Sequence, residues 1–310
     1  MTTDVCGLPL TLGDTEAPDA AVTAWNGVIK GFLSHAAATP DRMAETLGHA
    51  PDFALAHACK GLFCLLLARR ELIDTAADCL NRISDRVETL TQREALYVKA
   101  LDLWLKGQPS GSAWCMEDIL THHPEDALAM KLGQSIRFML GDAGGMRRSL
   151  ERIAPAWADD HPARGYLDGC YAFALEEAGD YAEAEAYGRA ALERAPDDAW
   201  GLHAVAHVHD MTGDSKRGLD WLLPRREAWA HCNNFRYHVW WHLALMHLDR
   251  GEMAEVLRLY DETIRADHTD DYRDISNAAS LLMRLQIEGV PVGGRWEELA
   301  EISSRRIEDG

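Results

Sequence analysis

Two pairs of histidines have the type and spacing of residues that do chemistry. His203 and His207 are four residues apart, and so are His238 and His242. On a helix, this spacing places both imidazoles of a pair on one face, where they can transfer protons or hold a metal ion. Asp210 follows His207 by three residues, so we expect its carboxylate to accept the second N–H of His207 and to raise the basicity of that ring. These five residues are the candidate catalytic groups.

A zinc site is the alternative use of the same histidines. Neither pair encloses or precedes the glutamate that is typical of zinc-peptidase helices, and sites with four histidine ligands are uncommon. We therefore predict acid–base chemistry or hydrogen bonding, with no metal and no cofactor. The sequence also contains no serine nucleophile elbow, P-loop or dinucleotide fingerprint.

Six glycines at near-fixed intervals predict the elements that must position these residues. The intervals between them are 34, 38, 34, 38 and 38 residues. A period of this length is typical of a solenoid in which each unit is one pair of antiparallel helices. Each glycine is expected in the turn within a pair, where a positive φ angle costs little without a Cβ atom. The glycines are Gly107, Gly141, Gly179, Gly213, Gly251 and Gly289.

The unit at residues 165–200 identifies the kind of repeat. Ala184 and Ala191 are small enough for two helices to cross closely, and Pro196 ends the second helix because it has no N–H to donate. With Gly-Asp-Tyr at 179–181, this pattern resembles a tetratricopeptide repeat. The predicted fold is therefore an all-α, tetratricopeptide-like helical-repeat solenoid of about seven helix pairs, curled around a central pocket. We expect an irregular N-terminal arm over residues 1–18 and a single repeat domain over residues 19–310.

The repeat phase places three neighbouring first helices on the concave side of this solenoid. The groove-facing stripe of the unit that begins at Ala199 is Trp200, His203, His207 and Asp210. The stripe of the following unit is His238, Trp241 and Leu245 with His242 beside it, and that of the preceding unit is Tyr166, Gly169, Phe173 and Glu176 with Glu177 beside it. We expect these side chains to line one shared cavity. The predicted substrate-binding residues are Tyr166, Cys170, Phe173, Glu177, Trp200 and Trp241.

Several of these residues also have a plain structural interpretation. A histidine inside a helix is usually a packing residue, and His209 and His247, which fall off the stripe, are assigned that role. Trp200 and Trp241 could equally pack neighbouring helices. Cys170 lies near the level of His203, where a Cys–His nucleophile is conceivable, but a small buried cysteine is the favoured interpretation.

Composition limits the compartment and the partners. The net charge of −19 argues against a nucleic-acid ligand and disfavours an anionic membrane surface. No segment approaches 18 uncharged apolar residues, and the N-terminus lacks the basic start of a signal peptide. The seven cysteines are scattered and odd in number, so we predict a reduced, cytoplasmic protein. A homo-oligomer is a possible assembly.

The amino-acid sequence of the later repeats resembles that of one protein family. His-Ala-Val-Ala-His at 203–207 and Trp-Trp-His-Leu-Ala-Leu at 240–245 resemble the tetratricopeptide-repeat protein 38 family. The resemblance runs from about Ala21 to the final helix and implies an all-helical repeat protein, but no settled reaction. His203, His207, His238, Trp240, Trp241 and His242 match that pattern, although Val239 stands where the family usually has asparagine.

Two functions remain open at this stage. The first is the binding of a small molecule in the concave pocket, with hydrolase-like acid–base turnover by the histidines and Asp210. The second is a non-enzymatic interaction module that recognises a protein or peptide segment in the same groove. A closed cavity of small-molecule size would favour the first function, and an open trough would favour the second.

Overall fold

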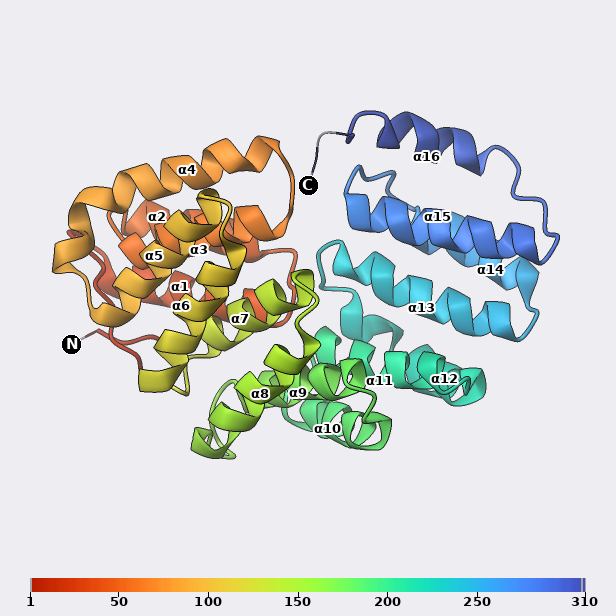
Figure 1. Ribbon diagram of the computed structural model, residues 1–310, viewed down its shortest axis with the longest axis horizontal. Helices are drawn as coiled ribbons and strands as arrows, with labels where there is room; N and C mark the ends of the chain where they lie inside the picture. The colour runs from red at the N-terminus through yellow and green to blue at the C-terminus, as the bar shows by residue number, and fades with distance from the viewer. Residues whose placement is uncertain (1, 308, 310) are drawn as a thin grey trace.

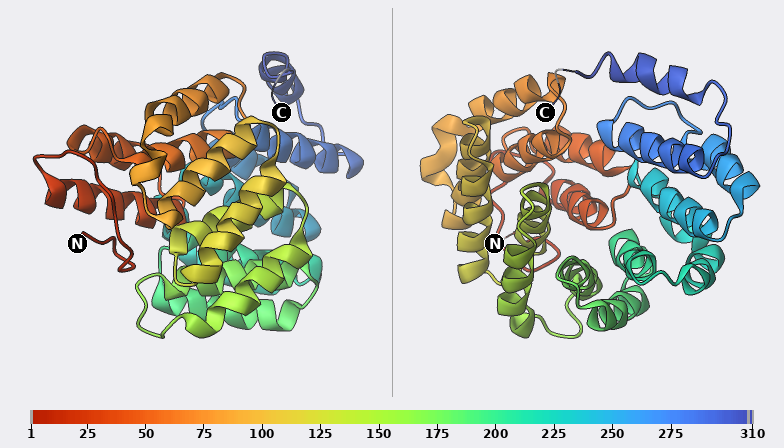
Figure 2. Two further views of the ribbon diagram at one scale, coloured as in Figure 1. Left: turned by 60° about the vertical axis from the view of Figure 1, so that its left-hand side comes forward. Right: turned by 45° about the vertical axis from the view of Figure 1, so that its right-hand side comes forward.

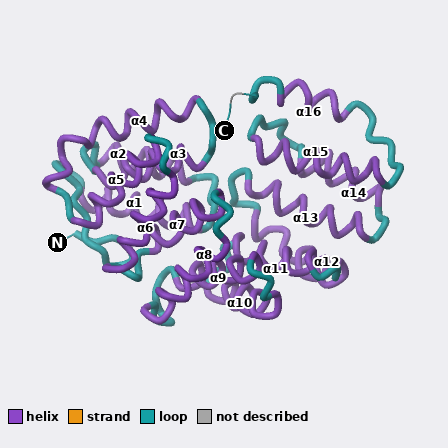
Figure 3. Tube along the Cα trace, viewed as in Figure 1, coloured by secondary structure: helices purple, strands orange, loops and turns teal. Residues whose placement is uncertain are grey.

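The computed structural model describes residues 2–307 and 309, and this part of the chain is all-α (Figures 1 and 3). It contains two isolated bridges, Thr3 with Pro9 and Ala36 with Cys232, but no strand within the described residues. The helices of the first half are α1 (Pro18–Leu33), α2 (Thr39–His49), α3 (Ala54–Leu66), α4 (Glu71–Ile83), α5 (Gln92–Leu105), α6 (Pro109–His122), α7 (Ala127–Met139) and α8 (Ala143–Ile153). Those of the second half are α9 (Arg164–Glu177), α10 (Tyr181–Arg194), α11 (Ala199–Met211), α12 (Ser215–Leu222), α13 (Phe235–Asp249), α14 (Met253–Leu259), α15 (Tyr272–Ile287) and α16 (Arg295–Ser303).

The turn glycines lie where the period predicts them. All six have positive φ angles between 67° and 86°, and each follows the first helix of a pair. The described residues form eight helix pairs rather than the expected seven or so. The extra pair escaped the count because the first two turns have no glycine: His35 (φ 58°) and Ala68 (φ 50°) take the left-handed conformation there. The all-α repeat fold is confirmed.

The array curls until its first pair lies against its later ones (Figure 2). The turn between α1 and α2 pairs with the segment between α12 and α13 through backbone hydrogen bonds: Ala37 N donates to His231 O (2.9 Å), and Asn233 N donates to His35 O (2.8 Å). In the right-hand view of Figure 2, α1 stands inside the ring of helices. Helix α1 thus occupies part of the centre of the ring, where the sequence predicted a pocket.

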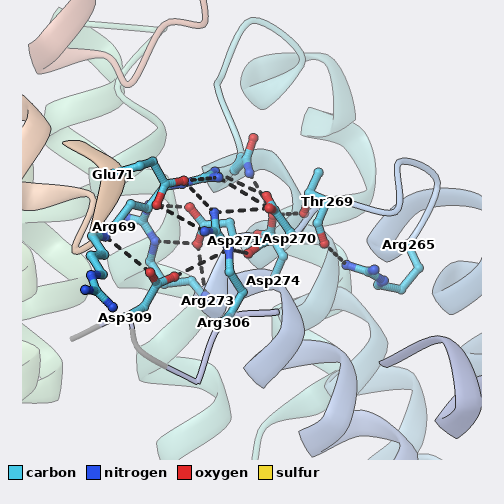
Figure 4. Close-up of polar contacts among 12 residues, drawn as sticks. Arg69, Glu71, Arg265, Thr269, Asp270, Asp271, Arg273, Asp274, Arg306 and Asp309 are labelled. Carbon is cyan, nitrogen blue, oxygen red and sulfur yellow. Dashed lines mark hydrogen bonds and ion pairs between the residues drawn. The ribbon is translucent and has the colours of Figure 1, made fainter. Parts of the chain in front are cut away.

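Ion pairs also join the two ends of the array (Figure 4). Arg306, after α16, lies 2.9 Å from Glu71 at the start of α4, and Arg69 lies 3.2 Å from Asp270 before α15. A cleft of about 680 Å³ lies beside this junction, lined by residues from 70–74, 304–307 and 309. A second cavity, of about 360 Å³, lies between residues 260–268 and 294–298.

The N-terminal segment before α1 packs on α5. The backbone N–H of Thr11 donates to Glu94 (2.7 Å), and the buried Asp4 lies 3.3 Å from Arg93. None of the helices in the described part of the chain is long and apolar enough to cross a membrane.

Close backbone approach brings α9 and α11 together at the level of the predicted site. A Cβ atom added to Gly169 would lie 3.1 Å from the Cα atom of Gly201 and 1.9 Å from a carboxylate oxygen of Asp198. Gly188 of α10 is similarly close to α11, because a Cβ atom there would lie 2.5 Å from Val205. These glycines explain how three helices can converge.

Candidate functional site

Four histidines from two adjacent first helices come together. His203 and His207 come from α11, and His238 and His242 come from α13. The Nε2 atom of His238 is 2.8 Å from Nε2 of His203 and 3.2 Å from Nε2 of His242. One ring nitrogen from each of the four lies within 4.8 Å of the others. We call this group the histidine cluster.

Aromatic rings surround the histidine cluster. Phe173 of α9 lies 5.7 Å from His203 and 5.6 Å from His207, ring centre to ring centre. Trp200 lies 5.3 Å from His203, and Trp241 is stacked on His238 at 5.4 Å. These rings exclude water from the imidazoles, so His203 and His242 are only 2% and 3% exposed.

In three of the four histidines, the Nδ1 atom faces a side-chain oxygen atom. Asp210 pairs with Nδ1 of His242, Glu176 lies 3.4 Å from Nδ1 of His207, and Asn277 lies 3.4 Å from Nδ1 of His238. The expected pairing of Asp210 with His207 is wrong. His207 faces α9, which supplies Glu176, whereas Asp210 reaches across to α13.

Burial dominates the electrostatics of the histidine cluster. It lowers the pKa values of His203, His238 and His242 well below the usual value for histidine, so these rings are neutral at pH 7. Burial also raises the pKa of Asp210 to about 7, an effect that the neighbouring His207 opposes.

Several buried polar atoms of the site have no hydrogen-bond partner among the described residues. They are Nδ1 of His203, Nε2 of His207, Oε2 of Glu176 and Nε1 of Trp241. Buried polar groups are normally satisfied because an unpaired one costs about 1–3 kcal/mol. Such atoms need partners from outside the chain, which can be water molecules or a bound ligand.

Three of the predicted substrate-binding residues lie outside this centre or at its margin. Tyr166 donates to Asp197 (2.7 Å) in the turn before α11. Cys170 is buried with its sulfur 3.9 Å from Nζ of Lys131, and burial raises the pKa of this thiol to about 11, which disfavours a nucleophilic role. Glu177 is exposed and forms a second group with Glu176 and His207, whose ligand atoms lie within 4.8 Å.

The structure adds residues that the sequence analysis did not select. Lys131 of α7 lies 4.4 Å from the ring centre of Trp200, and Phe138 lies 6.2 Å from the same ring. Both occupy stripe positions of the unit whose turn glycine is Gly141, so the same phase, extended by one repeat, would have found them. The ring of His35 is stacked on that of Trp200, with 5.3 Å between the ring centres. The repeat phase could not have selected His35, because it lies in a turn far from Trp200 in the sequence.

Comparison with known proteins supports the fold. No protein-family model matches the chain. It is similar to the structure of a Rap protein complexed with competence and sporulation factor, with a TM-score of 0.52 and 14% identity over 94% of this chain and 99% of that one. A second match, the TPR domain of P58(IPK), has 12% identity over 93% of this chain and 89% of that one, and its TM-score of 0.26 is too low to carry an argument. The chain thus has a tetratricopeptide-like helical-repeat fold, and the narrower family resemblance stays a prediction.

Proposed function

We propose that this protein is an interaction module that binds a segment of a partner protein beside the histidine cluster. The observation that carries the proposal is a set of exposed apolar side chains at the ends of three first helices, which belong to alternate repeats. Phe138, Met139 and Leu140 end α7 or follow it, Met211 ends α11, and Met283 and Ile287 lie in the last turns of α15. These six residues, which are 43% to 76% exposed, form what we call the turn edge.

Contacts connect the turn edge to the histidine cluster. Phe138 packs on Phe173, which touches His203. Met211 follows Asp210 directly, and Met283 precedes Arg284, whose guanidinium lies 6.0 Å from the ring centre of Trp241. Apolar side chains grouped in this way beside aromatic rings are typical of protein-binding surfaces.

Charge indicates the chemistry of the partner. The chain carries a net charge of −19, and the exposed Glu177 lies at the end of α9, between the repeats that supply the turn edge. A segment with apolar side chains for the six residues and with lysine or arginine for this carboxylate is complementary to this surface. The Rap protein, which shares the fold, was solved with a bound factor, and this supports a binding role for such an array.

A displayed library of short random peptides tests the proposal. We expect the wild-type chain to enrich sequences that combine apolar and basic residues, and Met211→Asp to weaken their binding by about tenfold or more, because it places a charge in an apolar contact. Trp114→Asp is the matched control, since Trp114 is 66% exposed on α6, the second helix of its pair. Failure to enrich any peptide, or an equal loss in both variants, would contradict the proposal.

Small-molecule binding with acid–base turnover is the second candidate. The pairing of Asp210 with His242 favours it, because a carboxylate behind an imidazole fixes the tautomer and raises the basicity of the ring. In this function His203, His207 and His238 would contact the ligand together with the rings of Phe173, Trp200 and Trp241. A thermal-shift screen of metabolites on the wild type and on His242→Gln checks it. A ligand that stabilises both proteins equally would argue against binding at the cluster.

A further inference from the structure

We propose that the histidine cluster binds one divalent transition-metal ion of the zinc class through the Nε2 atoms of His203, His207, His238 and His242. This site would join α11 to α13. The proposal goes beyond partner binding at the turn edge and does not depend on it.

The separations of the nitrogens fit a single ion. Zinc–nitrogen bonds of 2.0–2.1 Å in tetrahedral geometry place neighbouring nitrogens about 3.3 Å apart. The Nε2 separations of 3.2 Å for His238 with His242 and 2.8 Å for His203 with His238 lie close to that value. One ring nitrogen from each of the four histidines lies within 4.8 Å of the others, so small movements of the side chains would complete the tetrahedron.

The Nδ1 atoms of three of the histidines have the acceptors that are typical of histidines bound to a metal. A histidine that binds metal through Nε2 generally donates its Nδ1–H to a carboxylate or carbonyl oxygen, which fixes the tautomer. Asp210 and Asn277 are hydrogen-bonded to the Nδ1 atoms of His242 and His238, and a carboxylate oxygen of Glu176 lies 3.4 Å from Nδ1 of His207. Each of these three rings then presents its Nε2 lone pair to the common centre. Nε2 of His207 has no hydrogen-bond partner among the described residues, which leaves it available to an ion.

Charge and ligand type select the kind of ion. Four neutral imidazoles leave the two positive charges of the ion uncompensated, and the carboxylates of Asp210 and Glu176 lie directly behind two of the rings to offset them. Imidazole nitrogens suit Zn²⁺, Cu²⁺, Ni²⁺ and Fe²⁺, whereas Mg²⁺ and Ca²⁺ prefer oxygen. The site should therefore discriminate strongly against magnesium.

The coordination sphere defines what the ion does. Four protein ligands close a tetrahedral zinc site, and closed sites are structural. Two ligands from each helix clamp α11 to α13, the first helices of consecutive repeats. Metal ligation and proton transfer exclude one another here, because a nitrogen whose lone pair holds the ion cannot accept a proton.

Zinc binding to the full chain tests the proposal. The protein is stripped with a chelator, dialysed and titrated with Zn²⁺ and separately with Mg²⁺, and bound metal is measured by elemental analysis. We expect about one Zn²⁺ per chain, no uptake of Mg²⁺, and a melting temperature that rises with Zn²⁺. His203→Gln keeps the side-chain volume and should lose the stoichiometric ion. His209→Gln, on the same helix and buried but outside the cluster, should keep it.

Asp210→Asn covers the possibility that His203→Gln does not fold. It leaves all four ligands in place and should weaken Zn²⁺ binding by about 10–100-fold, because it removes the carboxylate behind His242. Folded wild-type protein that takes up no Zn²⁺ would overturn the proposal. So would an equal loss in His209→Gln and His203→Gln, or an affinity for Zn²⁺ that Asp210→Asn leaves unchanged.

Discussion

Two buried polar centres, one in each half of the molecule, differ in whether their polar atoms are satisfied. In the first half, Arg93 lies between Asp126 (2.6 Å) and Asp4 (3.3 Å), and the hydroxyl of Tyr97 donates to Asp126 (3.0 Å). In the second half, the histidine cluster leaves Nδ1 of His203 and Nε2 of His207 without partners among the described residues. Burial alone therefore does not identify a functional site. A closed network holds elements together, whereas an open one needs water or a ligand to complete its hydrogen bonds.

The same contrast appears at two equivalent helix starts. Asp126 caps α7, and Asp198 caps α11, in the phrases Pro-Glu-Asp-Ala-Leu and Pro-Asp-Asp-Ala-Trp. Asp126 has Arg93 as a direct ionic partner, whereas Asp198 accepts only the backbone N–H groups of Trp200 and Gly201 in the described hydrogen bonds. Burial accordingly raises the pKa of Asp198 to about 7.

The largest expected effect comes from breaking the closed network. Asp126→Ala should lower the free energy of unfolding by about 3–5 kcal/mol, because it removes the cap of α7 and leaves Arg93 with one of its two buried carboxylates. Urea denaturation measures this loss. Asp52→Ala, at an exposed pair with Arg86 (2.8 Å), should cost no more than about 1 kcal/mol. Equal losses of unfolding free energy in the two variants would contradict a stabilising role for the buried network.

A pH-dependent effect should follow from Asp198. Its pKa is higher in the folded chain (about 7) than the ordinary value of 3.8, so the folded state binds the proton more tightly. The stability that this proton contributes is complete below about pH 4 and is lost as the pH rises through about 7. Asp198→Asn keeps the helix cap without titrating. Its stability relative to wild type should rise by about 3–4 kcal/mol between pH 4 and pH 8, at 1.36 kcal/mol per pKa unit. Urea unfolding at a series of pH values measures the stability of both proteins. A difference in stability that stays constant between pH 4 and pH 8 would refute this prediction.

Two neighbouring histidines should separate stability from binding. His209→Ala should cost about 1–3 kcal/mol in metal-free protein, because His209 is 1% exposed and packs near Gly218, yet it should leave zinc uptake intact. His207→Ala should cost less stability than His209→Ala, since the side chain of His207 is 22% exposed, and it should weaken zinc binding. Thermal unfolding and elemental analysis of both variants measure the two effects. A larger loss of stability in His207→Ala together with weaker zinc binding in His209→Ala would contradict this prediction.

The smallest effect on stability is expected at the turn edge. Met211→Asp should change the free energy of unfolding by no more than about 0.5 kcal/mol, because Met211 is 61% exposed. Peptide binding should nevertheless be lost. A large destabilisation in urea would show that Met211 supports the fold and would remove the turn edge as a free surface.

The repeat architecture and the placement of the four histidines on two helix faces could be read from the sequence. Gly179 and its equivalents mark the turns, and the helical period then places His203 with His207 and His238 with His242. The first two pairs were harder to count, because His35 and Ala68 form their turns without glycine. Both kinds of information are local, since turn geometry and helical phase depend on residues close together in the chain.

Tertiary structure alone decided which groups meet across helices. Asp210 pairs with His242 rather than with His207, and Glu176 takes the place beside His207. His35 reaches Trp200 only because the array curls back on its first pair. The sequence by itself determined the helices, their order and the faces that carry the histidines. The contacts between those faces depend on the axial register and rotation of packed helices, which are set by side-chain packing and close glycine contacts such as Gly169 with Gly201 over the whole array.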